Sequence, residues 1–307
     1  MAEADNDGTA PTRCGVVALV GAPNAGKSTL LNALVGAKIS IVTHKVQTTR
    51  ARVRGIAVAG ESQIIFVDTP GIFEPKRRLE RAMVATAWAA IQDADVVVLL
   101  YDAARKRRDA DTDLIIEGLK ARGLTAVLVL NKIDVIKRDK LLALAGDFNA
   151  EGIFAQIFMI SALTGDGLDD LRDHLTARMP EGPWLYPEDQ LSDLPLRLLA
   201  AEVTREKLFL QLHQELPYAL TVETESWEDF EDGSLRLEQT IYVQRETQKG
   251  ITLGKRGQRI KEVRAAAQAE LEGLLERKVH LFLFVKVREN WLDDLARYQP
   301  WGLDFKA

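Results

Sequence analysis

The eight residues at positions 21–28 constrain the fold of this chain more than any other feature. They read Gly-Ala-Pro-Asn-Ala-Gly-Lys-Ser, which fits the pattern G-x-x-x-x-G-K-[ST], and they follow the apolar run at residues 16–20. Between a strand and a helix, such glycines let backbone N–H groups turn inward around phosphates, and the helix start adds a favourable dipole. The segment therefore predicts a strand, a phosphate-binding loop and a helix that opens at Lys27.

Short apolar runs alternate with helical patterns from residue 15 to about residue 179. This alternation is typical of an α/β fold, with a mostly parallel sheet covered by helices on both faces. Continuous β-branched and leucine runs predict strands buried on both sides at residues 16–20, 64–67, 96–100, 127–130 and 157–160. A further strand over residues 52–58 is expected at an antiparallel edge.

Three more motifs each follow one of these strands, at the strand ends where open α/β sheets bind ligands. They are Asp68-Thr-Pro-Gly71, Asn131-Lys-Ile-Asp134 and Ser161-Ala-Leu163. Each could by itself be a simple turn. Four motifs in this order, each after a strand, instead favour a guanine nucleotide site in a P-loop domain.

The motif residues are expected to divide between phosphate, metal and base. Lys27 should reach the β- and γ-phosphates and the Gly71 N–H should meet the γ-phosphate, while Ser28 and Asp68 should hold Mg²⁺. A loop over residues 40–50 should supply a threonine to the metal and the γ-phosphate. We prefer Thr49, although the sequence does not separate it from Thr48. The predicted catalytic residues are thus Lys27, Thr49 and Gly71, and the predicted metal ligands are Ser28, Thr49 and Asp68.

Guanine should be chosen over adenine by Asp134, whose carboxylate can accept hydrogen bonds from N1–H and the 2-amino group. Adenine offers neither donor and would leave a desolvated carboxylate unpaired. Asn131 and Lys132 should brace the base, and the Ala162 N–H should donate to O6. The full predicted nucleotide-binding set is Gly21, Asn24, Ala25, Gly26, Lys27, Ser28, Thr29, Asp68, Gly71, Asn131, Lys132, Asp134, Ser161, Ala162 and Leu163.

The residue that orients the attacking water in Ras-like enzymes, a glutamine after the Asp-x-x-Gly glycine, has no counterpart here. That position is Ile72, so catalysis must use backbone groups, the loop and a cation. Asn24 stands where potassium-activated enzymes of this class carry an asparagine that helps to hold K⁺. Capping the loop is an equally good account of Asn24, so K⁺ is a candidate cofactor only.

Three prolines and a glycine within residues 180–187 predict a stiff connector and a domain boundary. The expected organisation is a disordered lead-in at 1–13, a nucleotide-binding domain at 14–180, a linker at 181–192 and a smaller domain with a tail at 193–307. The smaller domain reads α-β-β-α-α-β, an α+β arrangement. The single cysteine, Cys14, lies in an apolar run and is expected in the core.

The second domain contains Gly254-Lys-Arg-Gly257 at the start of a long helix, a G-x-x-G loop with two cations. Such a loop can lie against a nucleic-acid backbone, as in KH domains. Residues 245–264 carry seven Lys or Arg and two acids, whereas residues 223–232 carry six acids, although the whole chain has a net charge of −5. The predicted RNA-binding residues are Gly254, Lys255, Arg256, Gly257, Arg259, Lys261 and Arg264.

These motifs, together with Gln-Thr-Thr-Arg from Gln47 and Glu-Leu-Pro-Tyr from Glu215, resemble the Era GTPases of bacteria from about Cys14 onward. Several relatives share the GTPase motifs, so the Gly-Lys-Arg-Gly loop makes the resemblance specific. The resemblance implies a type II KH domain and a monomeric GTPase with slow intrinsic turnover. It also implies binding to the 3′ end of 16S rRNA during small ribosomal subunit assembly, and peripheral contact with the inner membrane. No signal pattern or membrane-length apolar run is visible, so a cytoplasmic location is expected.

Two other functional classes fit the same motifs. One is a nucleotide-gated RNA chaperone with negligible turnover, and the other is a protein or membrane interaction switch that binds no RNA. GTP turnover by a Lys27→Ala variant separates the first from an enzyme, and the salt dependence of RNA binding tests the second.

Overall fold

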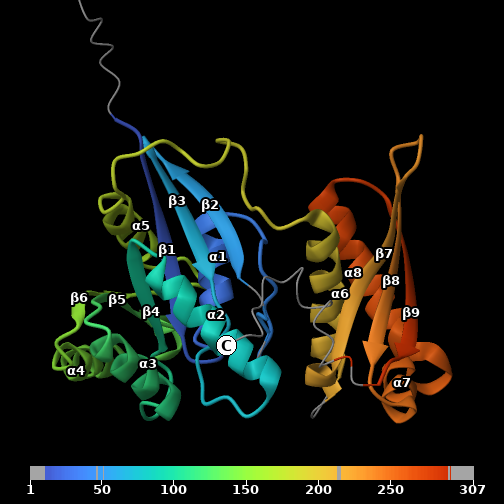
Figure 1. The fold of residues 1–307 in the computed structure, drawn as a ribbon, viewed down its shortest axis with the longest axis horizontal. Helices are drawn as coiled ribbons and strands as arrows, with labels where there is room; N and C mark the ends of the chain where they lie inside the picture. The colour runs from blue at the N-terminus through green and yellow to red at the C-terminus, as the bar shows by residue number, and fades with distance from the viewer. Residues whose placement is uncertain (1–10, 46–47, 51, 213–215, 290, 292–307) are drawn as a thin grey trace, which may run out of the picture.

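The computed structural model describes residues 11–45, 48–50, 52–212, 216–289 and 291. Over these residues the chain forms two bodies side by side, each built around its own sheet (Figure 1). Most of the predicted lead-in, residues 1–10, lies outside the described residues. So do Gln47 and Glu215 of the motifs that carry the family resemblance.

The first sheet has the strand order β2-β3-β1-β4-β5-β6. Its strands are β1 (Arg13–Gly21), β2 (Val53–Ala59), β3 (Ser62–Asp68), β4 (Val96–Asp102), β5 (Ala126–Asn131) and β6 (Phe154–Met159). The predicted antiparallel edge strand is confirmed, because β2 pairs antiparallel with β3 and the other four pairs are parallel. The expectation for Cys14 was wrong: it lies near the start of β1 and is only half-buried.

Helices cover both faces of this sheet. On one face lie α1 (Lys27–Val35) and α5 (Leu168–Thr176), and on the other lie α2 (Arg78–Gln92), α3 (Ala110–Ala121) and α4 (Arg138–Asn149). The start of α3 is fixed locally, because the Asp109 side chain accepts a hydrogen bond from the Thr112 N–H. The parallel strands bring the ends of β1, β3 and β5 to one edge, where the predicted motifs begin.

The second sheet has the order β7-β8-β9, formed by β7 (Leu220–Asp229), β8 (Leu235–Val243) and β9 (Val279–Val287). Two helices, α6 (Leu196–Gln211) and α8 (Gln258–Leu275), pack on one face of it. The order α-β-β-α-α-β is confirmed. The first of the two adjacent helices in this order is the short helix α7 (Glu246–Leu253), and the 3₁₀ turn η3 (Lys255–Gly257) joins it to α8.

The segment between α5 and α6 contains no helix and lies along the β2–β3 edge of the first sheet. The buried Gln63 side chain accepts from the N–H groups of Leu185 and Tyr186, at 2.9 and 3.0 Å, and donates to the Tyr186 carbonyl. Further on, Asp193 pairs with Arg54 at 2.7 Å. The connector is therefore held on the first sheet by specific polar contacts. Among the described helices, none is both long enough and apolar enough to cross a membrane.

Candidate functional site

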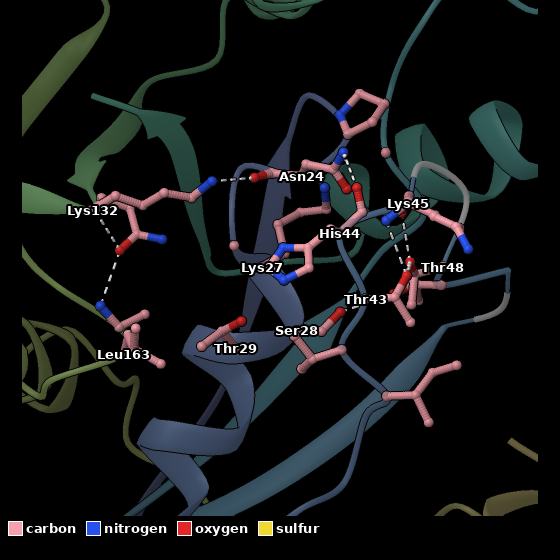
Figure 2. Close-up of a pocket in the computed structure, with 18 of the residues that line it drawn as sticks. Asn24, Lys27, Ser28, Thr29, Thr43, His44, Lys45, Thr48, Lys132 and Leu163 are labelled. Atoms are coloured by element: carbon pink, nitrogen blue, oxygen red, sulfur yellow. Dashed lines mark hydrogen bonds between the residues drawn. The ribbon is translucent and has the colours of Figure 1, made fainter. Parts of the chain in front are cut away.

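The predicted nucleotide residues surround one cavity of about 530 Å³ at the edge where β1, β3 and β5 end. Figure 2 shows this cavity with α1 and the phosphate loop on one side and Lys132 and Leu163 on another. Thirteen predicted site residues line it: Asn24, Gly26, Lys27, Ser28, Thr29, Thr49, Gly71, Asn131, Lys132, Asp134, Ser161, Ala162 and Leu163. Gly21, Ala25 and Asp68 are buried directly behind this wall.

The phosphate loop needs its two glycines for space. A Cβ on Gly26 would lie 2.2 Å from Asn131 Nδ2, and one on Gly21 would lie 2.5 Å from the Leu100 carbonyl oxygen. Gly26 also has a φ of +100°, which side chains of L-residues rarely adopt. Neither position tolerates alanine without a shift of the loop, so the sequence pattern here reflects backbone geometry.

Lys27 extends into the loop rather than into solvent. Its Nζ donates to the carbonyls of Gly21 and Ala22, at 3.0 and 3.1 Å, and only 6% of the residue is exposed. Burial lowers the pKa of Lys27 to about 8, which the Asp68 carboxylate partly opposes. An ammonium in this position is suited to bind phosphate oxygens. Their negative charge would stabilise the protonated lysine, which burial destabilises.

Three oxygen-bearing side chains meet beside Lys27. Ser28 Oγ donates to Asp68 Oδ2 at 2.6 Å, and Thr49 Oγ1 lies 2.9 Å from Ser28 Oγ and 3.2 Å from Asp68 Oδ2. Thr48 is different, because its hydroxyl bonds to Thr43 and to the Lys45 carbonyl. The structure thus brings Thr49, and not Thr48, together with the other two predicted metal ligands.

The chemistry of this oxygen cluster fits Mg²⁺, which prefers hydroxyl, carboxylate and phosphate oxygens. Asp68 is fully buried and its Oδ1 has no hydrogen-bond partner among the described residues. Burial raises the pKa of the Asp68 carboxyl above its ordinary value, against the opposing effects of Lys27 and three hydroxyl donors. A divalent cation would supply the missing partner and favour the charged carboxylate.

The guanine side is braced by Asn131. Its Nδ2 donates to the Ala25 carbonyl at 2.9 Å, and its Oδ1 accepts from the N–H groups of Lys132 and Ala162. Lys132, held at a φ of +68°, donates to Asp102 Oδ2 at 2.6 Å and to the Asn24 carbonyl at 3.0 Å. The motif Asn131-Lys-Ile-Asp134 therefore links the phosphate loop, the end of β4 and the loop after β6. The Ala162 N–H points at Asn131 here, whereas the sequence assigned it to guanine O6.

Residues 38–45 and 48–50, called the switch loop below, contribute another wall of the cavity. The sequence marked residues 40–50 for one threonine, but Ile41, Val42, Thr43, His44 and Lys45 line the cavity as well. Asn24 Nδ2 donates to the His44 carbonyl at 3.0 Å (Figure 2). Nothing in the sequence pattern indicated this contact, which needs the folded loop.

Ile72 is fully buried in the core beneath α2 and offers no polar group to the cavity. Its N–H lies 3.4 Å from the Gly21 carbonyl, which holds Gly71 close to Pro23. Water orientation by this side chain is therefore excluded. The groups left for catalysis are Lys27, the backbone of the two loops and the switch loop.

The basic G-x-x-G loop lies in the second body, where α7 ends and α8 begins. Gly254 has a φ of +72°, and a Cβ there would lie 2.7 Å from Arg259 Cβ. Lys255, Arg256, Lys261 and Arg264 are exposed. Arg259 is half-buried and its guanidinium donates to the Ile251 carbonyl, which makes it a brace of the loop as well as a candidate RNA contact.

Comparisons with known proteins agree with both parts of this arrangement. A family model described as a 50S ribosome-binding GTPase matches residues 16–132, and one described as a KH domain matches residues 215–292. The chain is 62% identical to the GTPase Era of Sinorhizobium medicae, covering 96% of this chain and 95% of that protein. It is 59% identical to the GTPase Era of Mesorhizobium japonicum, over 99% of this chain and 98% of that one.

Two solved Era structures have the same overall fold. One is an Era variant from Aquifex aeolicus bound to GDP·AlF₄⁻, and the other is Era in complex with MgGDPNP and nucleotides 1506–1542 of 16S ribosomal RNA. For each, the TM-score is 0.89 at 40% sequence identity, covering 95% of this chain and 99% of the solved chain.

Proposed function

This chain belongs to the Era family of GTPases, and from that premise we propose that it binds the 3′ end of 16S ribosomal RNA under the control of GTP and assists assembly of the small ribosomal subunit. Its enzymatic activity is the hydrolysis of GTP to GDP and phosphate, with Mg²⁺. We propose that GTP hydrolysis controls the binding of RNA by the second body.

The observation that supports RNA binding most strongly is the basic loop at the start of α8. Two glycines with positive φ flank the exposed Lys255 and Arg256, and Lys261 and Arg264 continue the exposed cations along the helix. Glycines allow a phosphate backbone to approach closely, and the cations favour it electrostatically. A similar Era structure holds the 3′ segment of 16S rRNA, which suggests the RNA that this loop meets.

For the GTPase site we propose the residue roles expected from the sequence. Lys27 and the Gly71 N–H would contact the phosphates, Asp134 would read guanine, and Ser28, Thr49 and Asp68 would hold Mg²⁺. When bound, Mg²⁺ supplies charge stabilisation for the phosphate oxygens. Intrinsic turnover should be slow, because Ile72 stands where Ras-like enzymes carry a water-orienting glutamine.

Potassium is a second proposed cofactor. The Asn24 side-chain amide donates a hydrogen bond through Nδ2 to the His44 carbonyl, so these two groups lie together beside the phosphate loop. Rotating that amide would offer two oxygens to a monovalent cation beside the phosphates. The domain boundaries at 14–180, 181–192 and 193–307, a monomeric state, a cytoplasmic location and peripheral membrane contact stay predictions.

The proposal is tested by binding the full-length protein to a single-stranded RNA copying the 16S 3′ end. Affinity should fall steeply between about 50 and 200 mM salt, because several phosphates are contacted. A scrambled RNA of equal length should bind more weakly. Equal binding to both RNAs would mean that the protein binds any polyanion, and would contradict specific recognition of 16S rRNA. A Lys27→Ala variant that turns over GTP like the parent would contradict the assigned GTPase site.

A further inference from the structure

Two motifs of the family resemblance, Gln-Thr-Thr-Arg and Glu-Leu-Pro-Tyr, meet through their described residues, because Arg50 of the first contacts Pro217 and Tyr218 of the second. Arg50, the last residue of the first motif, is buried in the second body. Its Nη1 donates to the Leu220 carbonyl at 2.9 Å, and its Nη2 lies 3.4 and 3.3 Å from the carbonyls of Pro217 and Tyr218. The ring of the buried Trp291 lies 5.9 Å from the Arg50 guanidinium carbon.

A second arginine reaches back from the other body. Arg205 of α6 has no exposed surface, and its Nη2 donates to the Thr48 carbonyl in the switch loop. Glu202, one turn earlier on α6, holds the guanidinium through Nε at 2.7 Å and through Nη2. Burying a guanidinium is costly unless it is paired, so Glu202 fixes where this group can point.

The residue between these two anchors is Thr49. Arg205 holds the Thr48 carbonyl, and the side chain of Arg50 is anchored in the second body, so the residues on both sides of Thr49 are tied to that body. The Thr49 hydroxyl is the one that lies beside Ser28 and Asp68. No atom of the second body needs to enter the nucleotide cavity for it to affect this position.

The rest of the switch loop follows the same face of α6. Lys38 pairs with Glu206 at 2.7 Å and also with Glu270 of α8, and the Val42 N–H donates to Glu206 Oε1 at 2.8 Å. Lys45 donates to the carbonyls of Phe209 and Leu212 at the end of α6. On α6, the contacting positions recur every three or four residues, which places them on one face of the helix.

This charged face of α6 is covered by the switch loop, while Ala201, Val203 and Leu208 face the second sheet. Glu206 and Arg205 would read as solvent-exposed helix residues in the sequence, yet they are 3% and 0% exposed. Their burial is explained by the loop that covers them, so the loop and the second body form one packed unit.

We propose that Arg205 and Arg50 are positioning residues of the GTPase site. By holding residues 48–50 against the second body, they fix the Thr49 hydroxyl beside Ser28 and Asp68. The docked KH domain thereby completes the magnesium side of the site. This inference deepens the proposed function, since it identifies the contacts through which nucleotide and RNA sites influence each other. By linkage, any RNA state that changes this docking must change Mg²⁺-dependent GTP binding to the same degree.

The test is a magnesium titration of GTP turnover by the full-length protein without RNA. The main variant combines Arg205→Met with Glu202→Gln, so that no carboxylate is left buried without its partner. The half-saturating Mg²⁺ concentration should rise about tenfold or more, as expected for losing a charge-assisted hydrogen bond. The affinity for GDP measured without Mg²⁺ should change less than about twofold, because Thr49 is not needed for it.

Two further variants make the result specific. Arg50→Lys keeps the charge but loses the planar guanidinium, and should also raise the half-saturating Mg²⁺ concentration. Arg54→Met is the matched control, because it removes the ion pair with Asp193 but does not touch residues 48–50. Titrations of the Arg205 and Arg50 variants that match the parent would overturn the inference. An equal shift in all three variants would overturn it too, since general loosening would then be the cause.

RNA binding provides an independent test of the positioning role. With the parent protein, a GTP analogue should change RNA affinity relative to GDP, and the Arg205 variant should abolish that difference. If the parent binds no RNA, the proposed function fails while the magnesium titration still decides the positioning role. If the variant retains the full nucleotide effect on RNA affinity, the positioning role is wrong even though RNA binding stands.

Discussion

The Thr49 hydroxyl lies 3.2 Å from Oδ2 of Asp68, a residue nineteen positions later at the end of a buried strand. The loop that carries Thr49 is therefore closed over the phosphate site in this structure. The same loop is bound along α6 of the second body. The contacts with Ser28 and Asp68 and the contacts with the KH domain thus come from one segment of chain.

The first prediction separates the two threonines of the switch loop. Thr49→Ala should lower kcat by about tenfold or more and raise the Mg²⁺ requirement, because a ligand hydroxyl beside Ser28 is lost. Thr48→Ala is the control, since the hydrogen bonds of its hydroxyl among the described residues stay within the loop, to Thr43 and the Lys45 carbonyl. Steady-state turnover at varied Mg²⁺ measures both. A larger effect from Thr48→Ala would reverse the assignment.

The second prediction concerns the monovalent cation. Asn24 has a φ of +64°, so Asn24→Gly removes the side chain while keeping a backbone that tolerates this angle. Turnover of the parent should be faster in KCl than in NaCl, and the variant should show equal rates in both salts. GTP affinity should be nearly unchanged. A variant that keeps the full potassium stimulation would assign Asn24 to loop capping.

The third prediction concerns base selection by Asp134, which lines the cavity next to Lys132. Asp134→Asn should weaken GTP binding by about a hundredfold, because two hydrogen bonds to a carboxylate are lost. It should improve binding of xanthosine triphosphate, whose 2-oxo group can accept from the new amide. A competition assay between GTP and xanthosine triphosphate measures this change in base preference. Unchanged preference for GTP would place guanine recognition elsewhere.

The fourth prediction uses two glycines with similar backbone angles. Gly254 and Gly233 have φ values of +72° and +80°, but only Gly254 lacks room for a side chain, against Arg259. Gly254→Asp should weaken RNA binding by more than about tenfold through the clash and the added negative charge. Gly233→Asp, on the β7–β8 hairpin, should leave RNA affinity unchanged. Similar losses in both variants would indicate unfolding rather than a loop effect.

Much of the nucleotide site could be predicted from the sequence because its geometry depends on local patterns. Gly26 has no room for a Cβ beside Asn131, and Lys27 is fixed by carbonyls five and six residues earlier. Buried parallel strands are similarly visible as continuous apolar runs, as in β4. In each case the residue type is dictated by neighbours that are close in the chain or by the pleat of one strand.

Contacts between the two bodies could not be predicted in this way. Arg50, Arg205 and Glu206 are charged residues whose burial depends on partners more than 150 positions away. Periodicity indicates which face of α6 is apolar, but it gives no signal that the opposite, charged face is also covered. The wall of the cavity formed by Thr43, His44 and Lys45 depends on that same long-range packing.

The most direct test of the central claim is the affinity of the full-length protein for the 16S 3′-end RNA, measured with a GTP analogue and with GDP at two salt concentrations. We expect tighter binding with the GTP analogue at both salt concentrations, and a parallel decline in affinity as salt rises. Equal affinity in the two nucleotide states would contradict it, because the GTPase site and the KH loop would then act independently.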